Sequence, residues 1–348
     1  MKTTHGSFAS DSNDSNDSND SNDSNDSNDS NDSNAFSVSG LGAFSGRRTS
    51  PILTSALIST SAELTRAYPG TTAPHLEQTL TPLAWDAALE RWSRDVRLRL
   101  YTWELLQGLQ FDASNADSGQ LKYADGSTST KMTRPLFDMP ATTAGQPKAL
   151  QDAVMWVIKK GALRQERMNE ILTQVSVPYA FFAMVLNLPA DRHRYVYELM
   201  AAALQLSGLV VMQFKHHFRV RRPADRSPLV QPMILTPGHG SFPAGHSTQC
   251  HLLAAILTRL VGDRLGGNSA AGTPGGDVPA QLIALADRIG ENRTVAGVHY
   301  EDDIKAGAVL GADLASYFLA KAVPTGNPPQ PASPLQWLWD KASREQWN

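Results

Sequence analysis

The apolar residues of this 348-residue chain recur at intervals of three and four along most of its length. This spacing is typical of amphipathic helices, and almost no segment alternates apolar and polar residues as a strand would. The spacing predicts helices at 81–111, 149–175, 178–187, 191–221, 246–264, 278–289 and 302–322. Thr81 and Pro82 form the expected start of the first helix. We therefore predict an all-α fold, a helical bundle.

Composition divides the chain into three parts. Residues 11–34 repeat a Ser-Asn-Asp triplet without an apolar residue, so 1–34 are predicted to be a disordered tail. Residues 35–322 are predicted to form a single all-α domain, in which 35–80, rich in Ser, Thr, Gly and Ala, form an irregular wrap. Residues 323–348 are predicted to be a Pro-rich segment followed by a short helix from Pro334. The Trp337, Trp339 and Trp347 cluster of this last part fits a subunit interface and docking on the core equally well.

Two segments lack the apolar spacing of helices. Residues 112–148 are polar, contain three Pro, and are too long for a simple connection, which suggests a lid or an insertion. The segment Gly266–Gly276 is rich in glycine but lacks the Lys-Ser/Thr of a phosphate-binding loop, which favours a linker.

The charge distribution narrows the range of partners. The net charge is −3, but residues 1–34 carry −7, so residues 35–348 carry +4. This surplus is too small to indicate nucleic-acid binding, yet it suits a small anion. The longest apolar stretches, Tyr179–Leu188 and Leu199–Phe214, are too short or too interrupted to predict a membrane span. The segment Met1–Ser10 has no apolar core of a secretory signal, so a cytoplasmic location is the default expectation.

Two polar segments interrupt the predicted helices near the middle of the C-terminal half. The first contains Lys215 and Arg222, which are seven residues apart and are predicted to share one face of a helix that ends before Pro223. Taken alone, cations at a helix end also fit the helix dipole. The second, His239-Gly-Ser-Phe-Pro-Ala-Gly-His246, directly precedes an apolar helix. Backbone N–H groups at such a helix start can bind an anion.

A third polar segment runs from Arg293 to Asp303. His299 and Asp303 are four residues apart, so the carboxylate can accept a hydrogen bond from one imidazole nitrogen. The other nitrogen is then presented as a nucleophile or a metal ligand. Taken alone, such a pair more often caps a helix.

Together, the patterns Lys-x6-Arg-Pro, Pro-Ala-Gly-His and Arg-x5-His-x3-Asp resemble the signature of the type 2 phosphatidic acid phosphatase and vanadium-dependent haloperoxidase superfamily. The resemblance covers about residues 190–320. It implies a helical bundle that holds a tetrahedral oxyanion, which is phosphate in one branch and vanadate in the other. Phosphate could occupy the same site in either branch.

The resemblance assigns the residues that would bind the oxyanion. Lys215, Arg222 and Arg293 would surround its equatorial oxygens with positive charge, and Gly245 would donate its backbone N–H. Arginine supplies planar bidentate donors and lysine a point charge.

The resemblance also assigns the catalytic roles. His299 would be the vanadium ligand or the phosphatase nucleophile, oriented by Asp303. His246 would be the general acid–base, and Lys215 would polarise the oxidant.

Two positions bear on the branch of the superfamily. The family usually has Ser where this chain has Ala244, so one hydroxyl donor to the oxyanion is lost unless a water or Ser247 replaces it. His239 resembles the bromoperoxidase arrangement, in which a His near the oxyanion replaces an aromatic residue typical of chloroperoxidases, although a turn residue is an equal alternative.

The leading hypothesis is a vanadate-dependent haloperoxidase that oxidises bromide or iodide with hydrogen peroxide to hypohalous acid, with an organic acceptor as a further candidate partner. The alternative is a soluble acid phosphatase that uses His299 as its nucleophile. A third reading, prompted by Ala244, is an oxyanion-binding protein without turnover. No nucleic-acid or membrane partner is expected, and the resemblance implies dimers or larger assemblies.

Overall fold

The computed structural model describes residues 51–66, 84–176, 178–264, 277–326 and 329–345. The predicted tail 1–34, the linker Gly266–Gly276 and the helix start at Thr81 lie outside the described residues.

The described part of the chain is predominantly helical, so the predicted fold class is confirmed. The α-helices are α2 (Pro51–Arg66), α3 (Trp85–Arg91), α4 (Arg94–Leu106), α5 (Gln146–Lys160), α6 (Arg164–Thr173), α7 (Tyr179–Leu186), α8 (Arg194–Phe218), α9 (Pro223–Arg226), α10 (Gly245–Arg264), α11 (Val278–Val295), α12 (Glu301–Ala322) and α13 (Pro334–Arg344).

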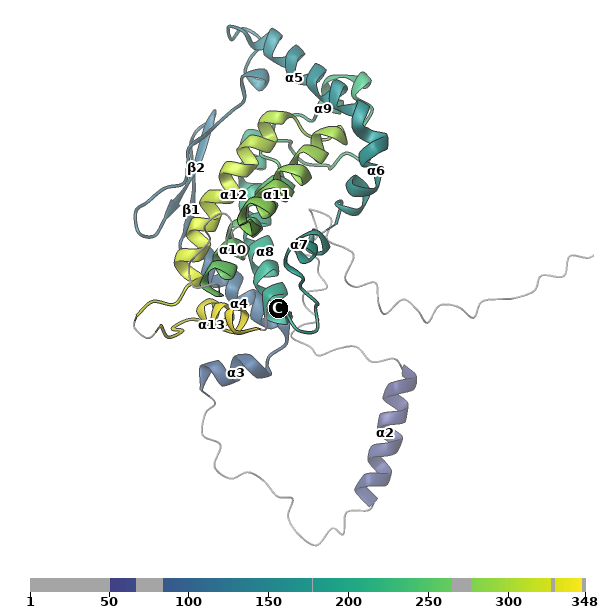
Figure 1. Cartoon of the computed structure of the whole chain (residues 1–348), viewed down its shortest axis with the longest axis vertical. Coiled ribbons are helices and arrows are strands. Elements are labelled where there is room, and N and C mark those ends of the chain that lie inside the picture. Colours follow the sequence, from purple (N-terminus) through teal and green to yellow (C-terminus); the bar gives the residue numbers. More distant parts are fainter. Residues whose placement is uncertain (1–50, 67–83, 177, 265–276, 327–328, 346–348) are drawn as a thin grey trace, which may run out of the picture.

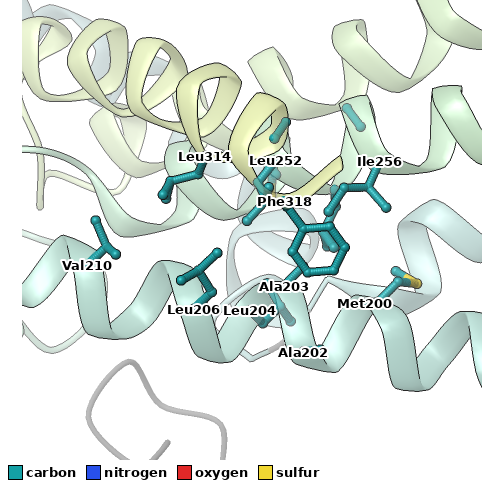
Figure 2. Packing of buried hydrophobic residues seen from close by; sticks show 14 of the residues in the cluster. Met200, Ala202, Ala203, Leu204, Leu206, Val210, Leu252, Ile256, Leu314 and Phe318 are labelled. Atoms are coloured by element: carbon teal, nitrogen blue, oxygen red, sulfur yellow. The ribbon is translucent and has the colours of Figure 1, made fainter. Parts of the chain in front are cut away.

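Helix α10 is the centre of the bundle and packs most extensively against α12 and α11, with α8 on a further side. Figure 1 shows α5, α6 and α9 at one end of this bundle and α3 and α13 at the other. Aliphatic and aromatic side chains fill the space between the helices, with Leu206 and Val210 of α8 on one side and Leu314 and Phe318 of α12 on the other (Figure 2). Burial of this apolar surface is the main force that holds the helices together.

Two glycines on α12 allow α10 to approach closely. A Cβ atom on Gly307 would lie 2.6 Å from the carbonyl oxygen of Ala244, and one on Gly311 would lie 2.6 Å from that of Thr248. The two glycines are four residues apart and therefore share one face of α12. The close approach lets the Ala244 N–H donate to the Asp303 carbonyl oxygen over 2.9 Å, which joins the starts of the two helices.

A small antiparallel sheet occupies much of 109–133, so the helix predicted to run to 111 ends at Leu106, and the segment predicted to be a lid or an insertion contains strands. Strand β1 (Leu109–Asn115) pairs with β2 (Ser118–Tyr123), and β2 pairs with β3 (Met132–Thr133). The sheet packs on the bundle through Phe111, whose ring centroid lies 4.8 Å from that of Phe214 in α8. Alternation between core-facing and exposed residues extends over only a few positions in each strand, too few to stand out in the sequence.

Several helix boundaries differ from prediction. The helix predicted at 81–111 is broken between α3 and α4 at Trp92 and Ser93, which have extended backbone. Residues 51–66, predicted to be part of an irregular wrap, form α2. The prediction missed this helix because its many Ser and Thr residues obscure the helical spacing of Ile52, Leu57 and other apolar residues.

The C-terminal helix docks on the core. Trp337 and Trp339 of α13 are each only 3% exposed within the single chain, which favours core docking over a subunit interface for these two residues. Trp347 lies outside the described residues.

Within the described residues, one stretch, Arg194–Arg226, is long and apolar enough to cross a membrane. Two thirds of its most apolar window (67%) are buried inside the structure, as in the core helix of a bundle.

Candidate oxyanion site

The nine predicted site residues gather where several helix ends meet. They come from the last turn of α8, the turns before and after α9, the start of α10, the end of α11 and the start of α12. In this order they are Lys215, Arg222, His239, Ala244, Gly245, His246, Arg293, His299 and Asp303. Lys215, Arg222, His246 and His239 all lie close enough to His299 to act on it electrostatically.

Lys215 and Arg222 do not share a helix face, contrary to prediction. Helix α8 ends at Phe218, and Arg219 adopts a left-handed backbone conformation with φ of 52°. The chain therefore turns away after α8, and Arg222 becomes the residue that caps α9. The turn, and not helical periodicity, brings the Arg222 guanidinium to the same site as Lys215.

His299 is held between a carboxylate and a guanidinium. Its Nδ1 lies 3.0 Å from Asp303 Oδ2, and its Nε2 lies 3.0 Å from Arg222 Nη1. A carboxylate accepts and a guanidinium only donates, so Nδ1 carries the proton and Nε2 presents a lone pair. The imidazole is thus neutral and oriented, as a nucleophile or metal ligand requires.

Burial sets the protonation of this pair. Desolvation, followed by the charges of Arg222 and Lys215, holds the pKa of His299 well below its ordinary value. Desolvation also raises the pKa of Asp303 to about 6, against hydrogen bonds from Ser241 and the Tyr300 N–H that favour the carboxylate. Near neutral pH, the arrangement is a carboxylate beside a neutral imidazole.

The two nearest cations are buried and bonded to neutral acceptors. Lys215 Nζ donates to the carbonyl oxygens of Gly240 and Ser241 over 3.0 and 3.2 Å. Arg222 Nη1 also donates to the Val298 carbonyl oxygen over 2.7 Å, and its Nη2 lies 3.1 Å from His239 Nδ1. His239 therefore contacts a site residue directly.

His246 and Arg293 both contact Gln174 at the end of α6. His246 Nε2 lies 2.9 Å from the carbonyl oxygen of Gln174, at the end of α6. Arg293 is 1% exposed, and its Nη2 donates to the Ile171 carbonyl oxygen and to Gln174 Oε1 over 3.2 and 3.3 Å. Gln174 thus bonds to two of the predicted site residues.

The start of α10 contributes backbone and no hydroxyl. Gly245 is its first residue, so the Gly245 N–H is among the groups that have no acceptor within the helix. Ala244 is fully buried and bonds to α12 through its N–H. The hydroxyl of Ser247 donates to the Ile304 carbonyl oxygen over 2.8 Å, so it faces α12 and does not replace the missing serine at position 244.

Two residues of the site were missed from the sequence. The Ser241 hydroxyl donates to Asp303 Oδ2 and lies 3.4 Å from His299 Nδ1. Ser241 lies within the polar segment 239–246, three residues before Ala244. Its place in that segment was the only feature of the sequence that could have indicated it. Gln174 lies on α6, outside all three motifs, and no local pattern marks it.

The donor set fits an oxyanion. The predicted site residues comprise three cations, one carboxylate and an imidazole lone pair, so positive charge exceeds negative charge in a buried volume. Buried charge of one sign is costly unless a partner of the other sign is bound. Among the described residues, no group of three or more His, Cys, Asp or Glu could hold a bare metal cation.

A surface cavity lies beside the site. It has a volume of about 370 Å³ and is lined by Thr130–Leu136, by Phe242 and by the α12 residues Asp302, Lys305, Ala306 and Val309. Phe242 follows Ser241 in the chain, and Asp302 precedes Asp303, so the cavity and the site share two segments.

One family model and two solved structures are similar to parts of this chain. The family model described as the VCPO second helical-bundle domain matches residues 224–325. One similar structure is the crystal structure of the first bacterial vanadium-dependent iodoperoxidase, with 17% sequence identity and a TM-score of 0.40. The similarity covers 52% of this chain and 52% of that chain, so this chain spans about half the length of the iodoperoxidase. A transmembrane PAP2-type phosphatidylglycerolphosphate phosphatase from Bacillus subtilis is 20% identical with a TM-score of 0.38, over 50% of this chain and 86% of that one. A search of curated proteins gives no match.

Proposed function

This chain belongs, through residues 224–325, to the vanadium-dependent haloperoxidase and type 2 phosphatidic acid phosphatase superfamily, and from this premise we propose that it is a vanadate-dependent haloperoxidase. One observation carries the proposal: His299 presents its Nε2 lone pair beside Arg222, while Asp303 holds the proton on Nδ1. A neutral imidazole with a fixed tautomer is the form that ligates vanadium or attacks phosphorus.

The cations of the site bind the oxyanion. Lys215, Arg222 and Arg293 offer donors from three different segments, so that they can contact different oxygens. Arg222 now donates to His299 Nε2, and binding requires it to exchange this hydrogen bond for one to the oxyanion. When bound, vanadate supplies Lewis-acid activation of hydrogen peroxide without changing its oxidation state.

Proton movement falls to His246. It lies on the first turn of α10, where it would accept a proton from hydrogen peroxide and later return one. Lys215 would donate a hydrogen bond to the oxidant and so make it more electrophilic toward bromide or iodide.

His239 supports the haloperoxidase branch. Its Nδ1 lies 3.1 Å from Arg222 Nη2, so it belongs to the surroundings of the oxyanion and is more than a turn residue. By resemblance to bromoperoxidases, this position favours bromide or iodide as the halide.

The organic acceptor is proposed to bind in the cavity beside Phe242. Met132, Leu136 and Val309 give this cavity an apolar lining, which suits an apolar acceptor. A cytoplasmic location and an oligomeric state stay predictions from the sequence.

A soluble phosphomonoesterase is the second candidate, because the same His299 geometry serves it. His299 Nε2 would attack phosphorus in line, His246 would protonate the leaving alcohol, and water would then hydrolyse the phosphohistidine.

The discriminating experiment uses the full chain purified without phosphate buffer. The protein is incubated with vanadate, hydrogen peroxide and bromide, and bromination of a β-diketone dye is followed. We expect turnover that depends on vanadate, is inhibited by phosphate, and is abolished in His299→Ala. The matched control is His216→Ala, which removes an exposed imidazole from the last turn of α8 and should leave turnover unchanged.

Two other outcomes would reverse the ranking. Hydrolysis of an aryl phosphate that vanadate inhibits, without vanadate-dependent bromination, would favour the phosphatase. Calorimetric binding of vanadate and phosphate without turnover in either assay would favour an oxyanion-binding protein.

A further inference from the structure

Helix α6 ends at the oxyanion site, and its last contacts are made by Gln174. This residue caps α6, is 1% exposed, and lies outside the three motifs. We infer that Gln174 is a positioning residue that fixes the tautomer of His246 and holds Arg293 without cancelling its charge. The inference rests on the proposed function, because it assigns a task to these two residues in binding and proton transfer.

The first contact fixes where the proton of His246 lies. His246 Nε2 is 2.9 Å from the backbone carbonyl oxygen of Gln174, and a carbonyl oxygen can only accept. Nε2 therefore carries a proton, and in the neutral form of the ring Nδ1 is the nitrogen without one. The neutral rings of His246 and His299 then have opposite tautomers, with the proton on Nε2 in His246 and on Nδ1 in His299.

The second contact holds a cation with a neutral acceptor. Gln174 Oε1 accepts from Arg293 Nη2 over 3.3 Å and from Asn292 Nδ2 over 2.9 Å. A neutral amide oxygen orients the guanidinium without placing a negative charge beside it. A carboxylate at this position would form an ion pair with Arg293 and compete with the oxyanion.

Helix α6 itself is anchored on α11, so that Gln174 is held in place. Glu170 accepts two hydrogen bonds from Arg288, over 2.9 and 2.7 Å, and a third from Asn292 over 3.0 Å. Arg167 donates to Asn292 Oδ1 over 3.2 Å. Arg167, Glu170 and Gln174 recur at intervals of three and four, so they share the face of α6 that contacts α11.

The test compares two substitutions of the same residue. Gln174→Met removes Oε1 but retains length, whereas Gln174→Glu retains an acceptor for Asn292 and Arg293 and adds a negative charge. Gln165→Glu is the matched control, because it adds the same charge on an exposed position of α6. Each full-length protein is examined by nitrogen-15 NMR of its histidine rings, with His246 assigned by comparison with His246→Asn, and by calorimetric titration with inorganic phosphate.

We expect wild-type His246 to be the Nε2–H tautomer. In Gln174→Glu this tautomer should persist, while phosphate binding weakens by about tenfold or more, the size of one lost charge-assisted hydrogen bond. Gln174→Met keeps the backbone carbonyl oxygen, so the tautomer should persist, while phosphate binding should weaken because Arg293 loses the amide oxygen that orients it. Gln165→Glu should match the wild type in both measurements.

The inference would be overturned by an Nδ1–H tautomer of wild-type His246, or by wild-type phosphate affinity in Gln174→Glu. A merely structural Gln174 would lower thermal stability in Gln174→Met and leave phosphate affinity unchanged in both variants, which would also overturn it. If the wild type does not bind phosphate at all, the proposed oxyanion site fails, and the tautomer measurement still decides the role of Gln174.

Discussion

The Arg222 guanidinium donates a hydrogen bond to Nε2 of His299 over 3.0 Å, on the side of the ring opposite Asp303. This contact occupies the lone pair that the proposed chemistry uses. Arg222 is therefore proposed to donate hydrogen bonds to the oxyanion, and before an oxyanion binds it occupies the Nε2 lone pair of His299.

The first prediction concerns the shape of this side chain. Arg222→Lys keeps the positive charge. The planar guanidinium can contact Val298, His239 and an oxyanion at the same time, whereas the single ammonium group of lysine cannot. We expect phosphate and vanadate to bind at least about tenfold more weakly, since a hydrogen bond to a charged group contributes roughly 1.5–3 kcal/mol. Calorimetry measures the affinity, and Arg221→Lys at the exposed neighbouring position is the control. Unchanged affinity in Arg222→Lys would remove Arg222 from the binding set.

The second prediction concerns Ser241 and the pH dependence of activity. Its hydroxyl donates to Asp303 and lowers the pKa of that carboxyl, which burial raises to about 6. Ser241→Ala removes a group that favours the carboxylate, so the pKa of Asp303 rises further. Asp303 must be ionised to hold the proton on His299 Nδ1, and we therefore expect the acidic limb of the activity profile to move to higher pH.

The measurement is the pH dependence of bromide oxidation, or of aryl phosphate hydrolysis if that is the activity found. Ser207→Ala is the control, because Ser207 is equally buried but donates to the Leu204 carbonyl oxygen within α8. An acidic limb that stays in place or moves to lower pH would contradict the role given to Ser241.

The bundle was predictable from the sequence because long helices repeat their apolar spacing many times. The sheet at 109–133 was not, because in β1 core-facing positions such as Leu109 and Phe111 alternate over only a few residues. Its stability comes instead from tertiary contacts, such as the stacking of Tyr123 on Tyr317 at 4.9 Å between ring centroids. No pattern within the strands specifies those partners.

The site was predictable where its residues lie in short motifs, and it was not where tertiary packing supplies them. The i, i+4 spacing of His299 and Asp303 predicts their contact, which the structure has at 3.0 Å. The argument that put Lys215 and Arg222 on one helix face was wrong, because the left-handed conformation of Arg219 ends α8 early. Gln174 reaches the site only because α6 packs on α11, and local sequence does not encode that packing.

The third prediction concerns acid stability of the contact between α6 and α11. Hydrogen bonds from Arg288, and then from Asn292, lower the pKa of Glu170 to about 2, well below its ordinary value of 4.5. A carboxyl group whose pKa is lower in the folded than in the unfolded state stabilises the fold at pH values above its unfolded-state pKa. This stabilisation is lost as the pH falls through the folded-state pKa. We expect Glu170→Gln to lower the melting temperature at neutral pH, with the difference from wild type shrinking between pH 4.5 and 2.

Thermal unfolding followed by circular dichroism across this pH range measures the effect. The Glu170 side chain is 36% exposed, so solvent screening keeps its contribution modest. Glu166→Gln, an exposed position one turn earlier on α6, is the control and should not change the pH dependence. A difference between Glu170→Gln and wild type that is constant with pH would contradict the assignment.

The last prediction concerns the close approach of α10 and α12, on which the geometry of the site depends. A Cβ atom at position 307 would lie 2.6 Å from the Ala244 carbonyl oxygen and 2.8 Å from Ser247 Cβ, so Gly307→Ala must push the start of α10 away from Asp303. We expect a loss of about 1–3 kcal/mol in the free energy of unfolding, the usual cost of overpacking, together with weaker phosphate binding. Gly208→Ala in α8 is the matched control, because nothing lies within 4 Å of its Cβ, and it should stabilise the helix by about 0.5–1 kcal/mol. Denaturant unfolding measures both variants, and equal behaviour of the two would show that Gly307 does not set the distance between these helices.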